Sequence, residues 1–155
     1  GWFLYTFAVW DIFYYVFLWL VLGWPESILT WDILFLIPTT WTGPVLYPVL
    51  VSLTMILLAM AILTQVEKGK DTRLKGYEWT GLIAGSLVLI LGFVFDYSRH
   101  MLIHFSVFGM LDVKNPEVLE VATRYIPHRF PWWIFAIGEL IILTFIGLYY
   151  RRISR

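Results

Sequence analysis

The chain has 155 residues, of which 60% are hydrophobic, 19% are aromatic and 14% are charged, and its formal net charge is +0. Soluble domains are about half apolar and a quarter charged, so this composition excludes an ordinary soluble domain, and its low charge excludes a disordered chain. The balanced charge leaves no basic footprint for nucleic acid, and the lack of cysteine excludes disulfides, thiolate metal sites and cysteine nucleophiles.

Four apolar stretches match the roughly 20 residues that a helix needs to cross the hydrocarbon core of a bilayer. They cover residues 2–22, 43–65, 79–98 and 131–150. Their apolar runs are continuous and do not alternate with a period of two, which argues against strands. The sequence predicts one all-α domain over residues 1–155, an integral membrane bundle of four transmembrane helices in contact with membrane lipids.

Basic residues in the connecting segments indicate how the spans are oriented. One side carries Lys68, Lys70, Arg73, Lys75, Arg151, Arg152 and Arg155, and the other carries Arg99, Lys114, Arg124 and Arg129. Because basic residues gather on the cytoplasmic side, we expect both termini to be cytoplasmic. The first span follows Gly1 at once, and a longer natural chain upstream would leave this orientation unchanged.

Residues 23–43 form a tryptophan-rich loop on the predicted outer side. Pro25 fits the first turn of a short helix, and the apolar run 33–37 is too short to span, which indicates an interfacial or re-entrant piece. Tryptophan rings favour headgroup depth. We expect a membrane-lying loop clamped by its rings, or alternatively the lining of a binding cavity. Its structural residues are Trp24, Asp32 and Trp41.

A short amphipathic helix is predicted within the other outer segment, residues 112–129. Asn115 is a good N-cap, and Pro116 fits the first helical position. The apolar residues that follow fall on one face, as in a helix that lies on a protein or membrane surface.

Small residues form a stripe on the third span. Gly81 and Gly85 are four residues apart, and Gly92 follows two turns later. Such stripes let helices approach closely, so we expect this face to pack against another span or another chain.

Two acidic residues lie near the middle of their spans, Asp11 in the first and Glu139 in the fourth. Ionisable groups inside a membrane are costly and usually face the bundle interior or a functional pathway. One interpretation is a neutral acid with a hydrogen-bonding neighbour; the other is a proton or cation pathway. The neighbours considered are Trp10, Tyr14, Tyr15 and Thr144.

Histidines provide the candidate metal or haem site. Asp96, His100 and His104 are spaced by four and share one face of a helix, and His128 is predicted on the same outer side. A histidine pair with a nearby carboxylate is able to ligate a metal, whereas the alternative is that these rings are simply hydrogen-bonded. The sequence contains no HExxH, GxSxG or phosphate-loop motif, so the cofactors considered are a metal, a haem or a pigment at this site.

Four segments resemble an uncharacterised family of small multi-spanning bacterial inner-membrane proteins. They are WDIFYY (10–15), WPES (24–27), WDILFLIP (31–38) and WTGPVLYP (41–48). The resemblance covers the first two spans and their loop. The resemblance implies a bacterial inner-membrane helical bundle, and it assigns no catalytic residues to this chain.

These features favour a non-catalytic structural or accessory subunit of a larger membrane complex that handles electrons, protons or pigments. Its expected partners are other membrane-protein subunits, because the chain has a large aromatic surface and no complete catalytic set. The alternative is a metal- or haem-binding membrane enzyme, or an ion-translocating protein, that uses the outer histidine and aspartate residues.

Overall fold

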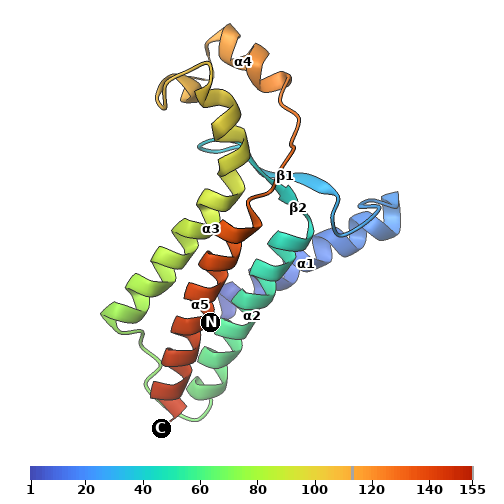
Figure 1. Cartoon of the computed structure of the whole chain (residues 1–155). Helices are drawn as coiled ribbons and strands as arrows, with labels where there is room; N and C mark the ends of the chain where they lie inside the picture. The colour runs from blue at the N-terminus through green and yellow to red at the C-terminus, as the bar shows by residue number, and fades with distance from the viewer. Residues whose placement is uncertain (113, 155) are drawn as a thin grey trace.

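The computed structural model of the protein describes residues 1–112 and 114–154, and it is mainly helical (Figure 1). Its long helices are α1 (Trp2–Leu22), α2 (Leu46–Val66), α3 (Gly76–Leu102) and α5 (Trp132–Ser154). The shorter elements are β1 (Trp31–Phe35), β2 (Trp41–Pro44), the 3₁₀ turn η1 (Gly109–Leu111) and α4 (Pro116–Thr123). Each long helix has the length and hydropathy of a membrane span. The predicted class, an all-α membrane bundle of four long helices, is confirmed.

The helix ends differ from the predicted spans by a few residues. Helix α3 has 27 residues and continues through Ser98 without a break. At a rise of 1.5 Å per residue it is about 40 Å long, so it extends beyond a hydrocarbon core of about 30 Å. Helix α2 begins at Leu46 and not at residue 43, because Gly43 belongs to a strand. Arg155, which the charge comparison counts, lies outside the described residues.

The loop over residues 23–43 differs from the prediction. All of it is described, and it does not form the expected short helix at Pro25; the run 33–37, expected to be an interfacial or re-entrant piece, begins as a strand. Instead β1 and β2 pair as an antiparallel hairpin, with Asp32 opposite Gly43. The pairing satisfies backbone groups that an irregular apolar loop would leave without partners near the membrane. The structural reason for the wrong prediction is therefore a contact between two segments, which neither segment reveals alone.

Helix α4 confirms the predicted amphipathic helix. The Asn115 side chain accepts a hydrogen bond of 3.0 Å from the backbone N–H of Glu117, and Pro116 is the first helical residue. Val118 is buried and packs with Tyr97 and Met101, which lie on the last turns of α3. Helix α4 thus caps the end of the bundle where the hairpin also lies (Figure 1). We call this the hairpin end.

Helices α3 and α5 form the most closely packed pair. A side chain at Gly81 would overlap the ring of Phe145, and a Cβ at Gly85 would lie 3.1 Å from the carbonyl oxygen of Gly138. Gly92 faces Phe135 in the same way at ordinary contact distance. The structure therefore places the glycine stripe against α5, where absent side chains permit close helix approach.

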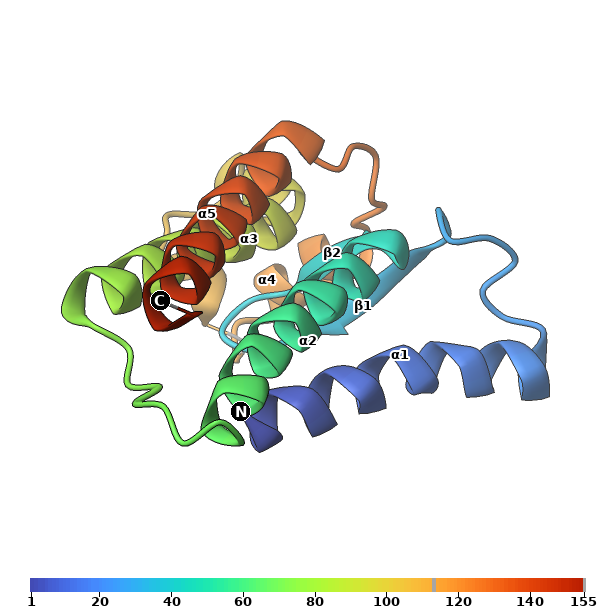
Figure 2. The ribbon, with the colours of Figure 1, turned by 90° about the horizontal axis from the view of Figure 1, so that it is seen from below.

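Helix α1 lies at the edge of the bundle. It packs along α2, with Gly1 beside Ile62 and Leu63. The two helices diverge towards the hairpin end, as the view from below shows (Figure 2). Only 11% of the apolar window of α1 is buried within the chain. Helix α1 therefore presents most of its surface to the membrane or to another molecule.

The close approach of α3 and α5 predicts different effects for two glycine substitutions. In Gly85→Ala, the new methyl group meets Ile142 and the Gly138 carbonyl, and we expect a loss of about 1–3 kcal/mol of stability from overpacking. Gly147→Ala is the control, because nothing lies within 4 Å of a Cβ there. Thermal unfolding in detergent micelles should show a lower midpoint for the first variant only. Equal midpoints would contradict this packing.

Candidate functional site

Hydroxyl groups of helix α2 bind the two acids that lie near the middle of their spans. Ser52 donates a hydrogen bond of 2.8 Å to Asp11 Oδ2 on α1, and Thr54 donates one of 2.8 Å to Glu139 Oε2 on α5. Residues two apart on a helix point in directions about 200° apart, so the two hydroxyls face opposite sides of α2. The expected neighbours of Asp11 and Glu139 were wrong, because hydroxyls of a different helix provide both hydrogen bonds.

Each of these acids lines a cavity. One cavity of about 290 Å³ lies among α2, α3 and α5 and is lined by Glu139 and otherwise mainly apolar side chains. The other, of about 460 Å³, lies among α1, the hairpin and α2 and is lined by Asp11 and Asp32. The side chains that border both cavities are Trp41, Val51, Met55 and Phe93. The same side chains therefore separate the cavity that contains Glu139 from the cavity that contains Asp11 and Asp32.

Two buried polar atoms at the first cavity have no hydrogen-bond partner among the residues that the structure describes. They are Oε1 of Glu139 and Nε1 of Trp41. One is available as an acceptor and the other is a donor. A buried polar atom without a partner costs about 1–3 kcal/mol, so these atoms favour water or a polar ligand group in this cavity.

Asp96 lies in a hydrogen-bond network at the hairpin end. The Tyr125 hydroxyl donates to Asp96 Oδ2 at 2.8 Å, and the backbone N–H of His128 donates to the same oxygen at 3.2 Å. Since the single Tyr125 hydroxyl proton is used there, Thr42 is the donor in its 3.1 Å contact with the Tyr125 oxygen. Burial, together with the Asp96 carboxylate, raises the pKa of Tyr125 above its ordinary value. Asp96 therefore ties the segment before α5 to α3 and β2.

The histidines do not converge on this carboxylate. The rings of His100 and His104 are 6.2 Å apart between centroids, and His100 Nε2 lies 3.4 Å from the backbone carbonyl oxygen of Val121. The His128 side chain is exposed, and it is the backbone of this residue that reaches Asp96. Within residues 1–112 and 114–154, no three His, Cys, Asp or Glu side chains are grouped so that they could hold one metal ion.

The expected outer-loop residues contribute to the hairpin end in different ways. Trp41 stacks on Phe93 of α3 with 6.5 Å between ring centroids, whereas Trp24 lies 6.3 Å from the Tyr15 ring of α1. Asp32 accepts a hydrogen bond of 2.9 Å from the Tyr15 hydroxyl. These contacts attach the loop to two different spans.

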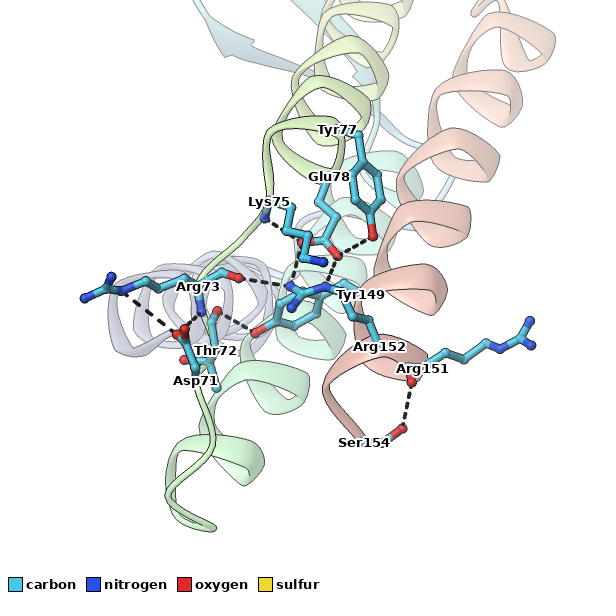
Figure 3. Close-up of polar contacts among 10 residues, drawn as sticks. All are labelled: Asp71, Thr72, Arg73, Lys75, Tyr77, Glu78, Tyr149, Arg151, Arg152 and Ser154. Carbon is cyan, nitrogen blue, oxygen red and sulfur yellow. Dashed lines mark hydrogen bonds and ion pairs between the residues drawn. The ribbon is translucent and has the colours of Figure 1, made fainter.

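A buried ion pair occurs at the opposite end of the bundle (Figure 3). Glu78, near the start of α3, is 0% exposed and accepts hydrogen bonds from Arg152 Nε at 2.7 Å and Nη2 at 2.8 Å. Arg152 Nη2 also donates to the carbonyl oxygen of Arg73, and the Tyr149 hydroxyl donates to that of Thr72. We call Glu78, Arg152 and Tyr149 the clamp, because together they bind the α2–α3 loop and α3 to α5.

The clamp is not among the features that the sequence predicts. One signal was available for Glu78: an acidic residue three positions after a helix N-cap, which often bonds back to the cap. Glu78 Oε2 does accept a hydrogen bond of 2.7 Å from the backbone N–H of Lys75. Its pairing with Arg152 had no such signal, because the two residues are 74 positions apart.

Comparisons with known proteins provide no relative from which to transfer a role. No protein-family model, curated protein or solved structure matches the chain. Any assignment of function therefore rests on the geometry of the chain's own residues.

The clamp predicts a large difference between two ion-pair substitutions. Glu78→Ala leaves the Arg152 guanidinium, which is 24% exposed, without its carboxylate, and we expect a loss of about 1.5–3 kcal/mol. Arg124→Ala is the control, since it breaks an exposed pair with Glu120 and should cost less than about 1 kcal/mol. Unfolding by denaturing detergent, followed by circular dichroism, measures both. A Glu78→Ala variant as stable as the control would show that the clamp has no stabilising role.

Proposed function

We propose that the protein is a non-catalytic structural subunit of a larger membrane complex, one that handles electrons, protons or pigments. The observation that supports this role is the exposure of large apolar side chains outside the spans, at the hairpin end. The most exposed are Ile37, beside the hairpin turn, at 84% and Phe108, beyond α3, at 86%. Others outside the long helices are Ile28, Leu29, Ile33, Leu36, Val107 and Ile126.

Lipid is a weaker explanation for these side chains than for those on the spans. Helix α3 is about 10 Å longer than a hydrocarbon core, and Val107 and Phe108 follow its end. Burial of apolar surface contributes about 25 cal/mol per Å², so several exposed large side chains favour association. Apolar patches at such positions are typical of contacts with other proteins.

The polar side chains of the interior are consistent with a structural role. Asp11, Glu139 and Asp96 each accept a hydrogen bond from another element, and Glu78 is paired with Arg152. Interhelical hydrogen bonds of this kind hold membrane helices together. Their use in contacts between elements supports a role in assembly.

The proposal predicts where a protein neighbour should be found. A photo-crosslinking amino acid at Ile37 or Phe108 should give a discrete adduct with another membrane protein in native membranes, detected by gel shift and mass spectrometry. The same probe at Arg151, exposed at the opposite end, is the control and should give no such adduct. Only lipid adducts at both test positions, with a monodisperse monomer in mild detergent, would exclude the subunit role.

We also propose that this membrane is the bacterial inner membrane, with both termini in the cytoplasm. The Lys and Arg residues of the α2–α3 loop and of the last turn of α5 support this orientation, because basic residues are retained on the cytoplasmic side. The segments concerned lie together at the end opposite the hairpin (Figure 1).

The chain offers a direct test of orientation, because it contains no cysteine. In intact cells, a membrane-impermeant maleimide should label Lys114→Cys at the hairpin end and should label Lys68→Cys only after permeabilisation. Both positions are exposed in the structure. The reverse pattern of labelling would overturn the orientation.

A further inference from the structure

The larger cavity, between α1, the hairpin and α2, has an acidic and aromatic lining. Its volume is about 460 Å³, and two carboxyl groups, those of Asp11 and Asp32, line it. Among the described residues that border it, none is lysine, arginine or histidine. Its charged groups are therefore of one sign.

Both carboxyl groups are held in place by neighbours, and both are positioned to receive a ligand. The Asp32 oxygens accept hydrogen bonds from the Tyr15 hydroxyl at 2.9 Å and from the Ile33 backbone N–H at 2.8 Å, as an ionised carboxylate does. Asp11 Oδ2 accepts from Ser52 at 2.8 Å. Within residues 1–112 and 114–154, its Oδ1 atom receives no hydrogen bond from the protein.

Aromatic rings form much of the remaining wall. Helix α1 contributes three neighbouring rings, with centroid separations of 6.0 Å between Phe7 and Trp10 and 5.8 Å between Trp10 and Tyr14. The hairpin contributes the ring of Trp41. The faces of such rings attract cations, most strongly when water is excluded. The combination of rings and carboxylates therefore selects for positive charge.

The wall that α1 contributes to the cavity belongs to one of the four candidate membrane spans. Trp10 borders it and is 61% exposed on the surface of α1, a helix that packs mainly along α2 and is joined to the hairpin through Tyr15 and Asp32. A ligand that enters between α1 and the hairpin must therefore come from the bilayer, so it needs apolar substituents around its charge.

We propose that this cavity binds a lipophilic organic monocation, such as a quaternary ammonium or phosphonium group with apolar substituents. Asp11 and Asp32 neutralise the charge, and the rings of Trp10, Tyr14 and Trp41 surround the substituents. The site does not depend on the subunit role proposed above, since Asp11 and Asp32 are not among the exposed apolar side chains on which that role rests.

The test uses tetraphenylphosphonium as the probe and the whole chain in detergent micelles free of choline lipid. Equilibrium dialysis of the radiolabelled cation should show saturable binding of one cation per chain. Tetraphenylborate has the same shape and the opposite charge, and it should not compete. Equal binding of the two ions would reduce the site to an apolar crevice and overturn the proposal.

Variants locate the binding in the cavity. Asp11→Asn and Asp32→Asn keep an acceptor for Ser52 and Tyr15 and should each lower the affinity at least tenfold, whereas Glu139→Gln, at the neighbouring cavity, should leave it unchanged. Trp10→Leu changes an exposed side chain with little effect on folding and should lower the affinity several-fold, so it tests the site even if an Asp variant unfolds. Unchanged binding in all the cavity variants would overturn the proposal.

A competition experiment with phosphatidylcholine then identifies the source of the cation. If added phosphatidylcholine displaces tetraphenylphosphonium from the wild type, the site accepts a lipid ammonium head group; if it does not, the site selects a free lipophilic cation. Either result supports a cation site, provided that the Asp variants have lost binding.

Discussion

The structure depends on one constraint: polar groups inside the hydrocarbon must be satisfied away from the lipid, because lipid tails form no hydrogen bonds. Helix α2 provides hydrogen-bond donors for the acidic side chains of its two neighbours, α1 and α5. Its Ser52 and Thr54 hydroxyls point in opposite directions and engage carboxyl groups on α1 and α5. The order of the helices follows from this, since α2 has to stand between the two acid-bearing helices. Without that position, either acid would lie in lipid without a hydrogen bond.

The two sides of α2 are held by different means. Helices α3 and α5 approach through Gly81, Gly85 and Gly138, so their contact consists mainly of close apolar packing. Helix α1 has no comparable stripe and diverges from α2, and the hairpin occupies the upper part of the fork between them. Close packing and the clamp join α3 and α5 on one side, while the wider spacing on the other side leaves room for the acidic cavity. The hairpin thus both attaches α1 and shapes that cavity.

The elements that the sequence predicts correctly are those specified by residues within the element itself. Continuous apolar runs predict four spans, and the pair Asn115 and Pro116 predicts the start of α4, because each signal lies within the element that it specifies. The hairpin, the hydroxyl partners of Asp11 and Glu139, and the pairing of Glu78 with Arg152 depend on contacts between distant segments. Among the candidate site residues, the spacing of His100 and His104 predicts one helix face, but α3 ends at Leu102 and His104 lies in the turn that follows it. The spacing could not reveal that Asp96 turns to Tyr125, because Tyr125 reaches α3 only through the fold of the α4 segment.

The clamp has a consequence for how the protein is made. Arg152 is synthesised 74 residues after Glu78, which at roughly 5–20 residues per second means a delay of several seconds. During this interval the start of α3 carries an acid without its cation, and water at the membrane surface must solvate it. Glu78 enters its buried place only when α5 has been inserted alongside α3. The last turn of α5 therefore acts as a latch that closes only after α5 has been made, and in a chain that stops before Arg152 the first turn of α3 is not secured.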